Sequence, residues 1–145
     1  MRPVVPRRTI RVSQIRLPSS TMAKSTVSSV HTNMTYAPIL QSQAIKAGGQ
    51  VYLSGQIPAD VEGNLIKRST RKRTIIKNTE AILNEAGSEL DRVVKVVINV
   101  KDLSIMPDFA SVYDPKFPHR PARSMVEVTR LPAGVDIQVD FTAVV

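Results

Sequence analysis

The residues from Val93 to Val100, Val-Val-Lys-Val-Val-Ile-Asn-Val, restrict the fold more than any other segment of the chain. Nearly all of them are β-branched, and β-branched side chains favour strands over helices. A segment that is almost continuously apolar is typical of a strand whose two faces are both covered. We therefore expect a central strand here, buried on both faces, at the deepest point of the core.

Patterns on either side of this segment predict the other elements. Apolar residues recur at spacings of three and four between Ser69 and Ala86, which indicates an amphipathic helix that ends before Gly87. Apolar and polar residues alternate from Val135 to Val144, so this last strand has one apolar and one polar face. We also expect strands at Val51–Gly55 and Ser124–Thr129, and a short helix at Pro107–Tyr113 that Pro115 ends.

These elements indicate a single α+β domain. A chain of 145 residues has room for one core of ordinary size. The order of strands and helices predicts a mixed β-sheet with two helices packed on one face, and the polar face of the last strand is left for an interface or a site.

The positive charge of the chain is concentrated at its N-terminal end. The net charge is +8, yet no acidic residue precedes Asp60, and residues 1–33 are rich in arginine and serine. This is the composition of a mitochondrial transit peptide, so we expect residues 1–33 to be disordered and removed on import into the matrix. A basic tail that binds nucleic acid or acidic lipid is the alternative. A start at Met22 or Met34 would give a shorter, cytosolic form.

The sequence lacks the residues that several kinds of chemistry require. With no cysteine, it cannot form a disulfide, a thiolate metal site or a cysteine nucleophile. The two histidines, His31 and His119, are too few for a histidine metal site and lack the partners of a serine triad. Lys46–Gly49 lacks the ending of a phosphate-binding loop, and no apolar run is long enough to span a bilayer. We expect a reaction without cofactor or metal, away from membranes.

Four motifs carry a family resemblance: Ser42–Gly48 (Ser-Gln-Ala-Ile-Lys-Ala-Gly), Val51–Pro58 (Val-Tyr-Leu-Ser-Gly-Gln-Ile-Pro), Leu90–Val96 (Leu-Asp-Arg-Val-Val-Lys-Val) and Pro121–Ser124 (Pro-Ala-Arg-Ser). Together they resemble the RidA family of reactive intermediate imine deaminases, also called YjgF, including its fungal mitochondrial members. We place this RidA-like domain at residues 34–145. The resemblance implies a chorismate-mutase-like subunit, a homotrimer with its sites in the clefts between subunits, and hydrolysis of 2-iminobutanoate and 2-iminopropanoate to 2-keto acids and ammonia without a cofactor.

The resemblance also assigns site residues. An imino acid presents a carboxylate beside an electrophilic C=N carbon, so its site needs a planar cation for the first and a placed water for the second. Arg123 matches the family arginine that holds the carboxylate by two parallel hydrogen bonds. Ser54 and Gly55 match residues that line the same pocket. Outside these motifs, the same residues would be interpreted as a surface ion-pairing arginine and a turn at a strand end.

Other site residues of the family are replaced. The glutamate credited with activating water is Gln138, and an amide can orient a water but cannot take up its proton. Asp140 is on the same strand face, but two residues along a strand is roughly 6.6 Å, too far to substitute unless the substrate shifts. A pocket cysteine and a pocket tyrosine become Met125 and Gln41. The segment Phe109–Tyr113 is about one helical turn shorter than the family's helix and omits a pocket asparagine.

The main helix begins in a basic cluster of Lys67, Arg68, Arg71, Lys72 and Arg73. Cations are unfavourable at this end of the helix dipole. An anion or RNA contact is one interpretation, because some family members have been described as acting on RNA, and a solvated basic face is the other. Single-stranded RNA needs aromatic side chains on which to stack, and aromatic residues make up 4% of the chain, so we do not expect a nucleic-acid partner.

We therefore expect a mitochondrial homotrimeric hydrolase of small 2-imino acids. Arg123 and Gln138 would act on the reacting substrate and water, and Ser54 and Gly55 would complete the substrate site. The alternative is a non-catalytic relative that binds 2-keto acids or a protein partner in mitochondria, which Gln138, Met125 and the shortened helix favour.

Overall fold

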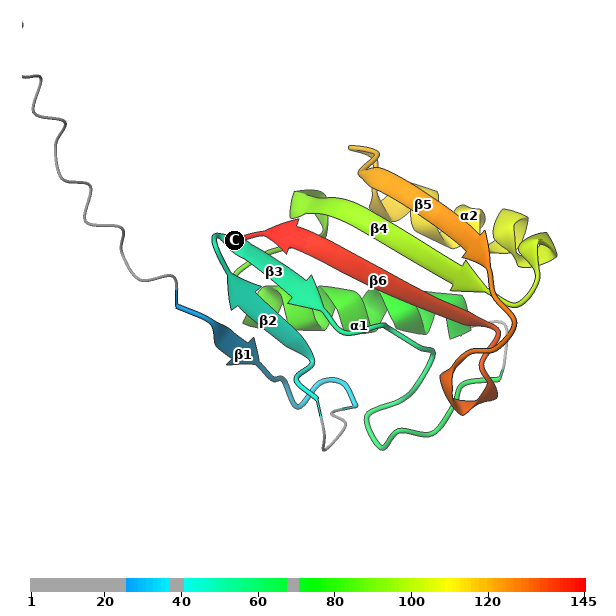
Figure 1. Ribbon diagram of the computed structural model, residues 1–145, viewed down its shortest axis with the longest axis horizontal. Helices are drawn as coiled ribbons and strands as arrows, with labels where there is room; N and C mark the ends of the chain where they lie inside the picture. The colour runs from blue at the N-terminus through cyan, green and yellow to red at the C-terminus, as the bar shows by residue number, and fades with distance from the viewer. Residues whose placement is uncertain (1–25, 37–40, 68–70) are drawn as a thin grey trace, which may run out of the picture.

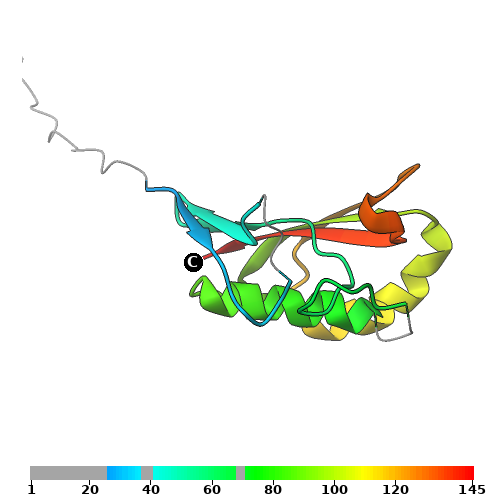
Figure 2. The ribbon, with the colours of Figure 1, turned by 90° about the horizontal axis from the view of Figure 1, so that it is seen from below.

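A computed structural model of the protein describes residues 26–36, 41–67 and 71–145. They form one six-stranded β-sheet in the order β1-β2-β3-β6-β4-β5, with two α-helices against one of its faces (Figures 1 and 2). The strands are β1 (Ser28–Val30), β2 (Ala44–Ala47), β3 (Gln50–Leu53), β4 (Val93–Val100), β5 (Ala122–Glu127) and β6 (Ile137–Val144), and the helices are α1 (Arg71–Glu85) and α2 (Met106–Tyr113).

The sheet is mixed. Neighbouring strands are antiparallel except for β4 and β5, which run parallel. A parallel pair requires a long crossover connection, and α2 lies within the one that joins β4 to β5 (Figure 1). The predicted α+β domain, with two helices on one face of a mixed sheet, is therefore confirmed. None of the described helices is long and apolar enough to cross a membrane.

Helix α1 covers the sheet with the side chains that its spacing predicts. The expected apolar positions of the pattern are all buried: Ile75, Ile76, Thr79, Ile82, Leu83 and Ala86. Thr79 is accommodated there because its hydroxyl donates to the carbonyl of Ile75 at 2.9 Å. Gly87 has a φ of +78°, the left-handed conformation that commonly ends a helix. The expected helix and its end are confirmed, although its first two expected residues, 69 and 70, lie outside the described residues.

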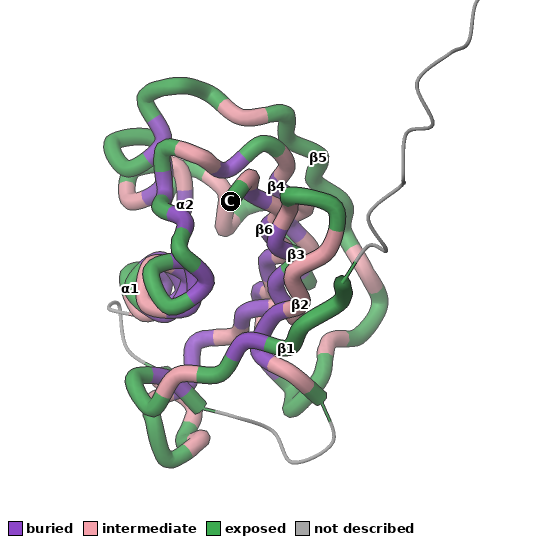
Figure 3. Tube along the Cα trace, turned by 90° about the vertical axis from the view of Figure 1, so that its left-hand side faces the viewer, coloured by how far each residue is buried: buried purple, intermediate pink, exposed green. Residues whose placement is uncertain are grey.

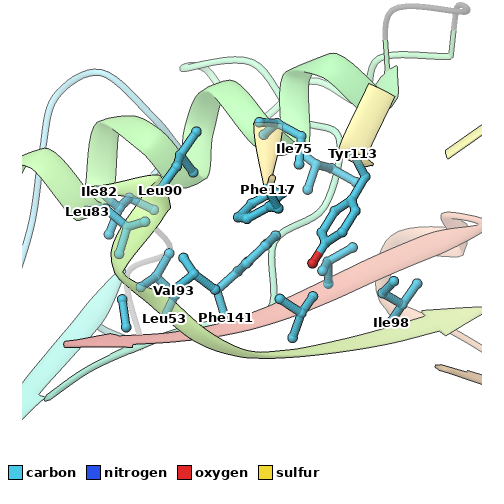
Figure 4. Close-up of a cluster of buried hydrophobic side chains, with 14 of the residues drawn as sticks. Leu53, Ile75, Ile82, Leu83, Leu90, Val93, Ile98, Tyr113, Phe117 and Phe141 are labelled. Atoms are coloured by element: carbon cyan, nitrogen blue, oxygen red, sulfur yellow. The ribbon is translucent and has the colours of Figure 1, made fainter. Parts of the chain in front are cut away.

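The core lies between the helices and the sheet, where buried residues concentrate (Figures 3 and 4). An aromatic stack fills its centre: the ring of Tyr113 lies 4.3 Å from that of Phe117, and Phe117 lies 5.9 Å from Phe141 of β6. Phe109 packs on Tyr113 at 5.5 Å. These rings attach α2 and the turn after it to the sheet, which explains how so short a helix is kept in place.

The short helix α2 ends at Tyr113, as the sequence predicts. Asp114–Lys116 follow α2 directly as a turn of 3-10 helix with Pro115 inside it. Proline needs no hydrogen-bond donor in the first turn of a helix, so it is tolerated at this change of helix type. A buried lysine also fixes α2, since Lys72 of α1 pairs with the Asp108 carboxylate at 3.0 Å.

Strand β4 is buried on one face, not on both as its sequence predicts. Val93, Val96, Ile98 and Val100 are buried, but Val94 is 42% exposed and Val97 is half-buried. The helices cover only one side of the sheet (Figure 2), so the second apolar face of β4 has no covering layer among the described residues. The side of β3, β4, β5 and β6 that faces away from the helices is of mixed character, and we call it the open sheet face.

The sheet begins before the expected start of the domain. Residues 28–30, assigned to a disordered leader that extends to residue 33, form β1 and pair with β2. Val30 is buried. The Gln43 side chain binds the next segment, because its amide oxygen accepts from the Thr32 N–H at 2.5 Å and its Nε2 donates to the Thr35 hydroxyl at 2.8 Å. The leader prediction for residues 1–25 lies outside the described residues.

Candidate active site

The side chains around Gly55 form a compact polar niche on the open sheet face. The chain leaves β3 at Leu53 and returns to β6 through a two-way backbone bridge between Gln56 and Val139, with N–O distances of 2.8 and 3.0 Å. This bridge places Gly55 directly against the side chains of Gln138 and Asp140. We call Gly55, Gln138, Asp140 and Asn99 the Gly55 niche.

Gly55 is required by this close approach. A Cβ atom at Gly55 would lie 2.6 Å from the Gln138 side-chain carbon Cδ and 2.9 Å from Asp140 Oδ1. Gly55 does not have the positive φ that would favour glycine for backbone reasons. Obstruction by a side chain, and not backbone conformation, therefore explains the glycine at this position.

Asp140 lies much nearer to Gln138 than strand spacing suggests. The two side chains converge on Gly55, and the Asp140 carboxylate accepts side-chain hydrogen bonds from Gln138 and from Asn99 of β4. Partial burial raises the pKa of Asp140 above its ordinary value of 3.8, while these two hydrogen bonds oppose the rise. Both side chains therefore reach Gly55 although their residues are two apart on β6, because side chains lean along the strand and the distance between Cα atoms does not decide the contact.

Ser54 is next to the niche, but its hydroxyl is already engaged. Its Oγ donates to the Ser42 carbonyl at 2.7 Å, which leaves the oxygen lone pairs to accept. Ser54 and Gly55 also border a cavity of about 80 Å³, into which Gln41, Gln43 and Asn78 extend. Gln41, which replaces the tyrosine that the family resemblance predicts, lines this cavity, and so does Tyr36.

Arg123 lies in a different place, at the start of the edge strand β5. It lines an open cleft of about 700 Å³ together with Arg120, the ring of Tyr113 and the turn that follows α2. The guanidinium of Arg123 lies over the Tyr113 ring, 5.3 Å from its centroid, and its Nη1 is 3.5 Å from an Asp114 carboxylate oxygen. The side chain of Arg123 is 40% exposed, so this contact with Asp114 does not bury the charge.

Arg123 and the Gly55 niche are on opposite faces of the sheet. Arg123 pairs in register with Val96, which is buried on the helix side, whereas Gln138 pairs with Asn99 on the open side. Side chains of paired residues on neighbouring strands project to the same face. The structure of one subunit therefore brings Ser54, Gly55 and Gln138 together but does not bring Arg123 to them.

Two of the five cations in the basic cluster at the start of α1 are paired within the subunit. Arg71 binds Asp136 at 2.8 Å, and the buried Lys72 binds Asp108 at 3.0 Å. Lys67 lines a surface cleft beside Arg71, and Arg68 lies outside the described residues. These two pairs connect α1 to the residue before β6 and to α2, so Arg71 and Lys72 have a structural role within the subunit.

Sequence reasoning missed two polar residues that shape the site. Asn78 of α1 is buried and donates to the Ala59 carbonyl at 2.9 Å, which fixes the loop after Gly55. Asn99 appears in the sequence as the one amide within the apolar run of β4. An amide in an apolar pattern is a signal for a hydrogen-bonding role, so both residues were detectable as polar exceptions.

Comparison with known proteins identifies relatives over this whole domain. The sequence model of the family described as endoribonuclease L-PSP matches residues 34–145. A protein of Saccharomyces cerevisiae named MMF1, mitochondrial, is 40% identical over 106 residues, which cover 71% of this chain and 73% of that protein. The 2-iminobutanoate/2-iminopropanoate deaminase of Salmonella typhimurium is 38% identical over 111 residues, covering 70% of this chain and 84% of the enzyme.

Solved structures show the same fold. The crystal structure of yeast Mmf1 superposes with a TM-score of 0.79 at 37% sequence identity, covering 82% of this chain and 98% of that one. The six-stranded sheet and its two helices therefore match a known architecture almost from end to end.

Proposed function

Because this chain belongs to the RidA family, also known as YjgF or L-PSP, we propose that it hydrolyses reactive 2-imino acids such as 2-iminobutanoate and 2-iminopropanoate. The products are the corresponding 2-keto acid and ammonia. The observation that carries the proposal is the half-exposed guanidinium of Arg123 in an open cleft, within a sequence 38% identical to an enzyme named for this reaction.

Arg123 would bind the substrate carboxylate. Its planar fork can donate two parallel hydrogen bonds to a carboxylate, and the edge of the Tyr113–Pro121 cleft leaves room for a ligand of a few carbon atoms. Asp114 at 3.5 Å and the Tyr113 ring beneath keep the guanidinium oriented while it remains accessible. The imine carbon is thereby held at a fixed distance from this anchor.

The rest of the site would come from a second copy of the chain. Arg123 is at a sheet edge on the helix side, and the Gly55 niche is on the open face, so one subunit cannot use both on one small substrate. A homotrimer in which the β5 edge of each copy meets the open face of the next would build three complete sites. Ser54 and Gly55 would line the substrate pocket there, and the Gln138 amide would orient water.

We also propose that the protein works in the mitochondrial matrix after removal of its basic leader. The support is the arginine-rich, acid-free composition of the N-terminal segment and the likeness to a yeast relative named as mitochondrial. Because β1 begins at Ser28, the cleavage site is expected before that residue. A form that begins at Met22 would keep the whole sheet and stay in the cytosol.

The test is an assay in which 2-iminobutanoate is generated in solution and its loss is followed with and without protein. We expect kcat/KM to fall about 100-fold in Arg123→Ala, the loss of a charged, two-point contact, and less in Arg123→Lys. Arg130→Ala is the matched control, because Arg130 is also exposed but does not line the cleft. Wild-type protein that is no faster than Arg123→Ala would refute the deaminase proposal.

A second candidate function is binding without hydrolysis. One reason is Gln138, because this amide stands where the resemblance predicts a glutamate. The other is Met125, which replaces a pocket cysteine and is 38% exposed on the same strand face as Arg123. In that case 2-ketobutanoate would bind to wild-type protein and not to Arg123→Ala in calorimetry, while neither protein accelerated loss of the imine.

A further inference from the structure

The geometry of the Gly55 niche points to Asp140 as the group that takes the proton from the attacking water, with Gln138 and Asn99 acting as positioning residues. This inference rests on the proposed imine hydrolysis and deepens it. It assigns the role of general base to a carboxylate that lies two residues after Gln138, the amide that replaces the family's glutamate.

The first support is that two side chains meet at one point. Gln138 and Asp140 both border the space above Gly55, where Asp140 Oδ1 lies 2.9 Å from the position that a Cβ atom would occupy. The same position lies 2.6 Å from Gln138 Cδ, so both side chains pack closely against the glycine and a water or ligand would approach them from the open sheet face. A carboxylate at Asp140 therefore reaches the same space as the residue beside it.

The second support is the set of hydrogen bonds that orient the carboxylate. The amides of Gln138 and Asn99 both bind it, the first from its own strand and the second from β4. An ionised carboxylate has about four acceptor positions, so two amide donors leave others available. A carboxylate with acceptor positions left over can accept a proton from water.

The third support is the charge around Asp140. The titratable groups that face it are Lys95 of β4 and Tyr52 of β3, both in register with the next outward residue, Thr142. Lys95 Nζ donates to the Ser124 hydroxyl at 2.8 Å, and the Tyr52 hydroxyl donates to Gln50 at 2.6 Å. Among the described residues no cation forms an ion pair with Asp140, so no paired positive charge lowers the basicity of its carboxylate.

The chemistry balances with this one carboxylate. Asp140 removes a proton from water as the water oxygen bonds to the carbon of the protonated imine, and the C=N electron pair moves to nitrogen. The neutral Asp140 then gives that proton to the amino group of the tetrahedral intermediate. The C–N bond breaks as the hydroxyl proton leaves with the nitrogen, which yields the 2-keto acid and ammonium and restores the carboxylate.

The test compares Asp140→Asn with wild type for kcat/KM on 2-iminobutanoate as a function of pH. General bases contribute about 100-fold or more, so we expect a loss of that size. Because burial raises the pKa of Asp140, the wild-type rate should fall in acid at a pH above the ordinary 3.8, and the variant should lack this limb. Asp136→Asn is the matched control, because Asp136 is a carboxylate just before β6 that is bound to Arg71.

A stability measurement separates this role from a structural one. Because the pKa of Asp140 is raised in the folded protein, the free energy of unfolding falls as the pH rises from the pKa of the unfolded chain to that of the folded chain. A variant without this charge should therefore have an unchanged or higher urea midpoint at pH 7. Asp140→Ser provides a second neutral variant with the same expected loss of turnover.

The outcomes are distinct. Imine loss that is no faster with wild type than with Arg123→Ala would overturn both the deaminase function and the role of Asp140. Two results would overturn the role of Asp140 alone, provided that the wild type is active. One is a kcat/KM of Asp140→Asn within threefold of the wild-type value, and the other is a fall of the rate in acid that persists in this variant. A parallel loss of 2-ketobutanoate affinity and turnover in both Asp140 variants would also overturn it, because a base acts on the rate more than on binding.

Discussion

At the scale of single residues, Tyr113 combines a packing role with an unsatisfied polar group. Its ring is 3% exposed, stacks on Phe117 and supports the guanidinium of Arg123. Its hydroxyl is buried without a hydrogen-bond partner, and this burial raises the pKa of Tyr113 to about 12. The ring, rather than the hydroxyl, therefore explains why an aromatic residue is useful here.

We predict that Tyr113→Phe stabilises the protein by about 1 kcal/mol, because the variant removes a buried donor that has lost its water. The unfolded chain ionises this tyrosine near pH 10.0 and the folded chain only near 12, so wild-type stability should fall through that interval. The variant should lose that part of the pH dependence. Urea titrations at pH 7 and at alkaline pH measure both effects.

Tyr52→Phe is the control for this prediction, since Tyr52 is exposed and its hydroxyl binds Gln50 on the surface. Its substitution should change the free energy of unfolding by less than about 0.5 kcal/mol. A clear destabilisation by Tyr113→Phe would show that the hydroxyl does find a partner in solution.

Residue identity alone predicted part of the site. The motif around Arg123 and the alternation that places Gln138 and Asp140 on one face were readable from the sequence. The convergence of Gln138 and Asp140 over Gly55 was not, because it depends on side-chain directions and on the backbone bridge from Gln56. Periodicity gives the face of a strand but not the distance between side chains on it.

At the scale of secondary-structure elements, the strand β1 shows where pattern reading fails. It has three residues, Ser28–Val30, too few to display alternation, and it lies in a serine-rich segment that resembles a leader. Its place is set by pairing with β2 and by the Gln43 side chain, both of which are distant in sequence. In the longer elements α1 and β6, by contrast, every apolar position that the spacing predicts is buried.

The strand β1 leads to a prediction about truncation. A chain that starts at residue 34 lacks β1, the buried Val30 and the Thr32 groups that bind Gln43, and we expect it to be about 2–4 kcal/mol less stable than a chain that starts at residue 26. Urea unfolding of the two forms measures the difference. Equal free energies of unfolding would mean that β1 contributes no stability.

At the scale of the whole molecule, the open sheet face carries apolar side chains that no described element covers. Tyr52, Val94 and Val126 are 46%, 42% and 47% exposed on β3, β4 and β5. The sequence predicted β4 to be covered on both faces, and a second copy of the chain would provide the missing cover. The prediction is wrong for the single subunit, because an apolar sequence does not show whether its second face is covered by the same chain or by a partner.

We therefore predict a mass in solution of three chains by light scattering. Val126→Lys should release monomers, because it would place an unpaired cation at an apolar contact. Val61→Lys is the control, since Val61 is 50% exposed in a loop away from the sheet. A wild-type monomer at micromolar concentration would contradict the trimer and with it the shared site.

The separation of Arg123 from the Gly55 niche has a genetic consequence. In the proposed trimer each site takes its carboxylate anchor from one chain and its water-handling groups from the next. An allele that loses Arg123 and an allele that loses Asp140 would each encode an inactive homotrimer. In a cell that expresses both, some mixed trimers would pair an intact Arg123 with an intact Asp140, so the two alleles would complement each other although they affect the same small domain.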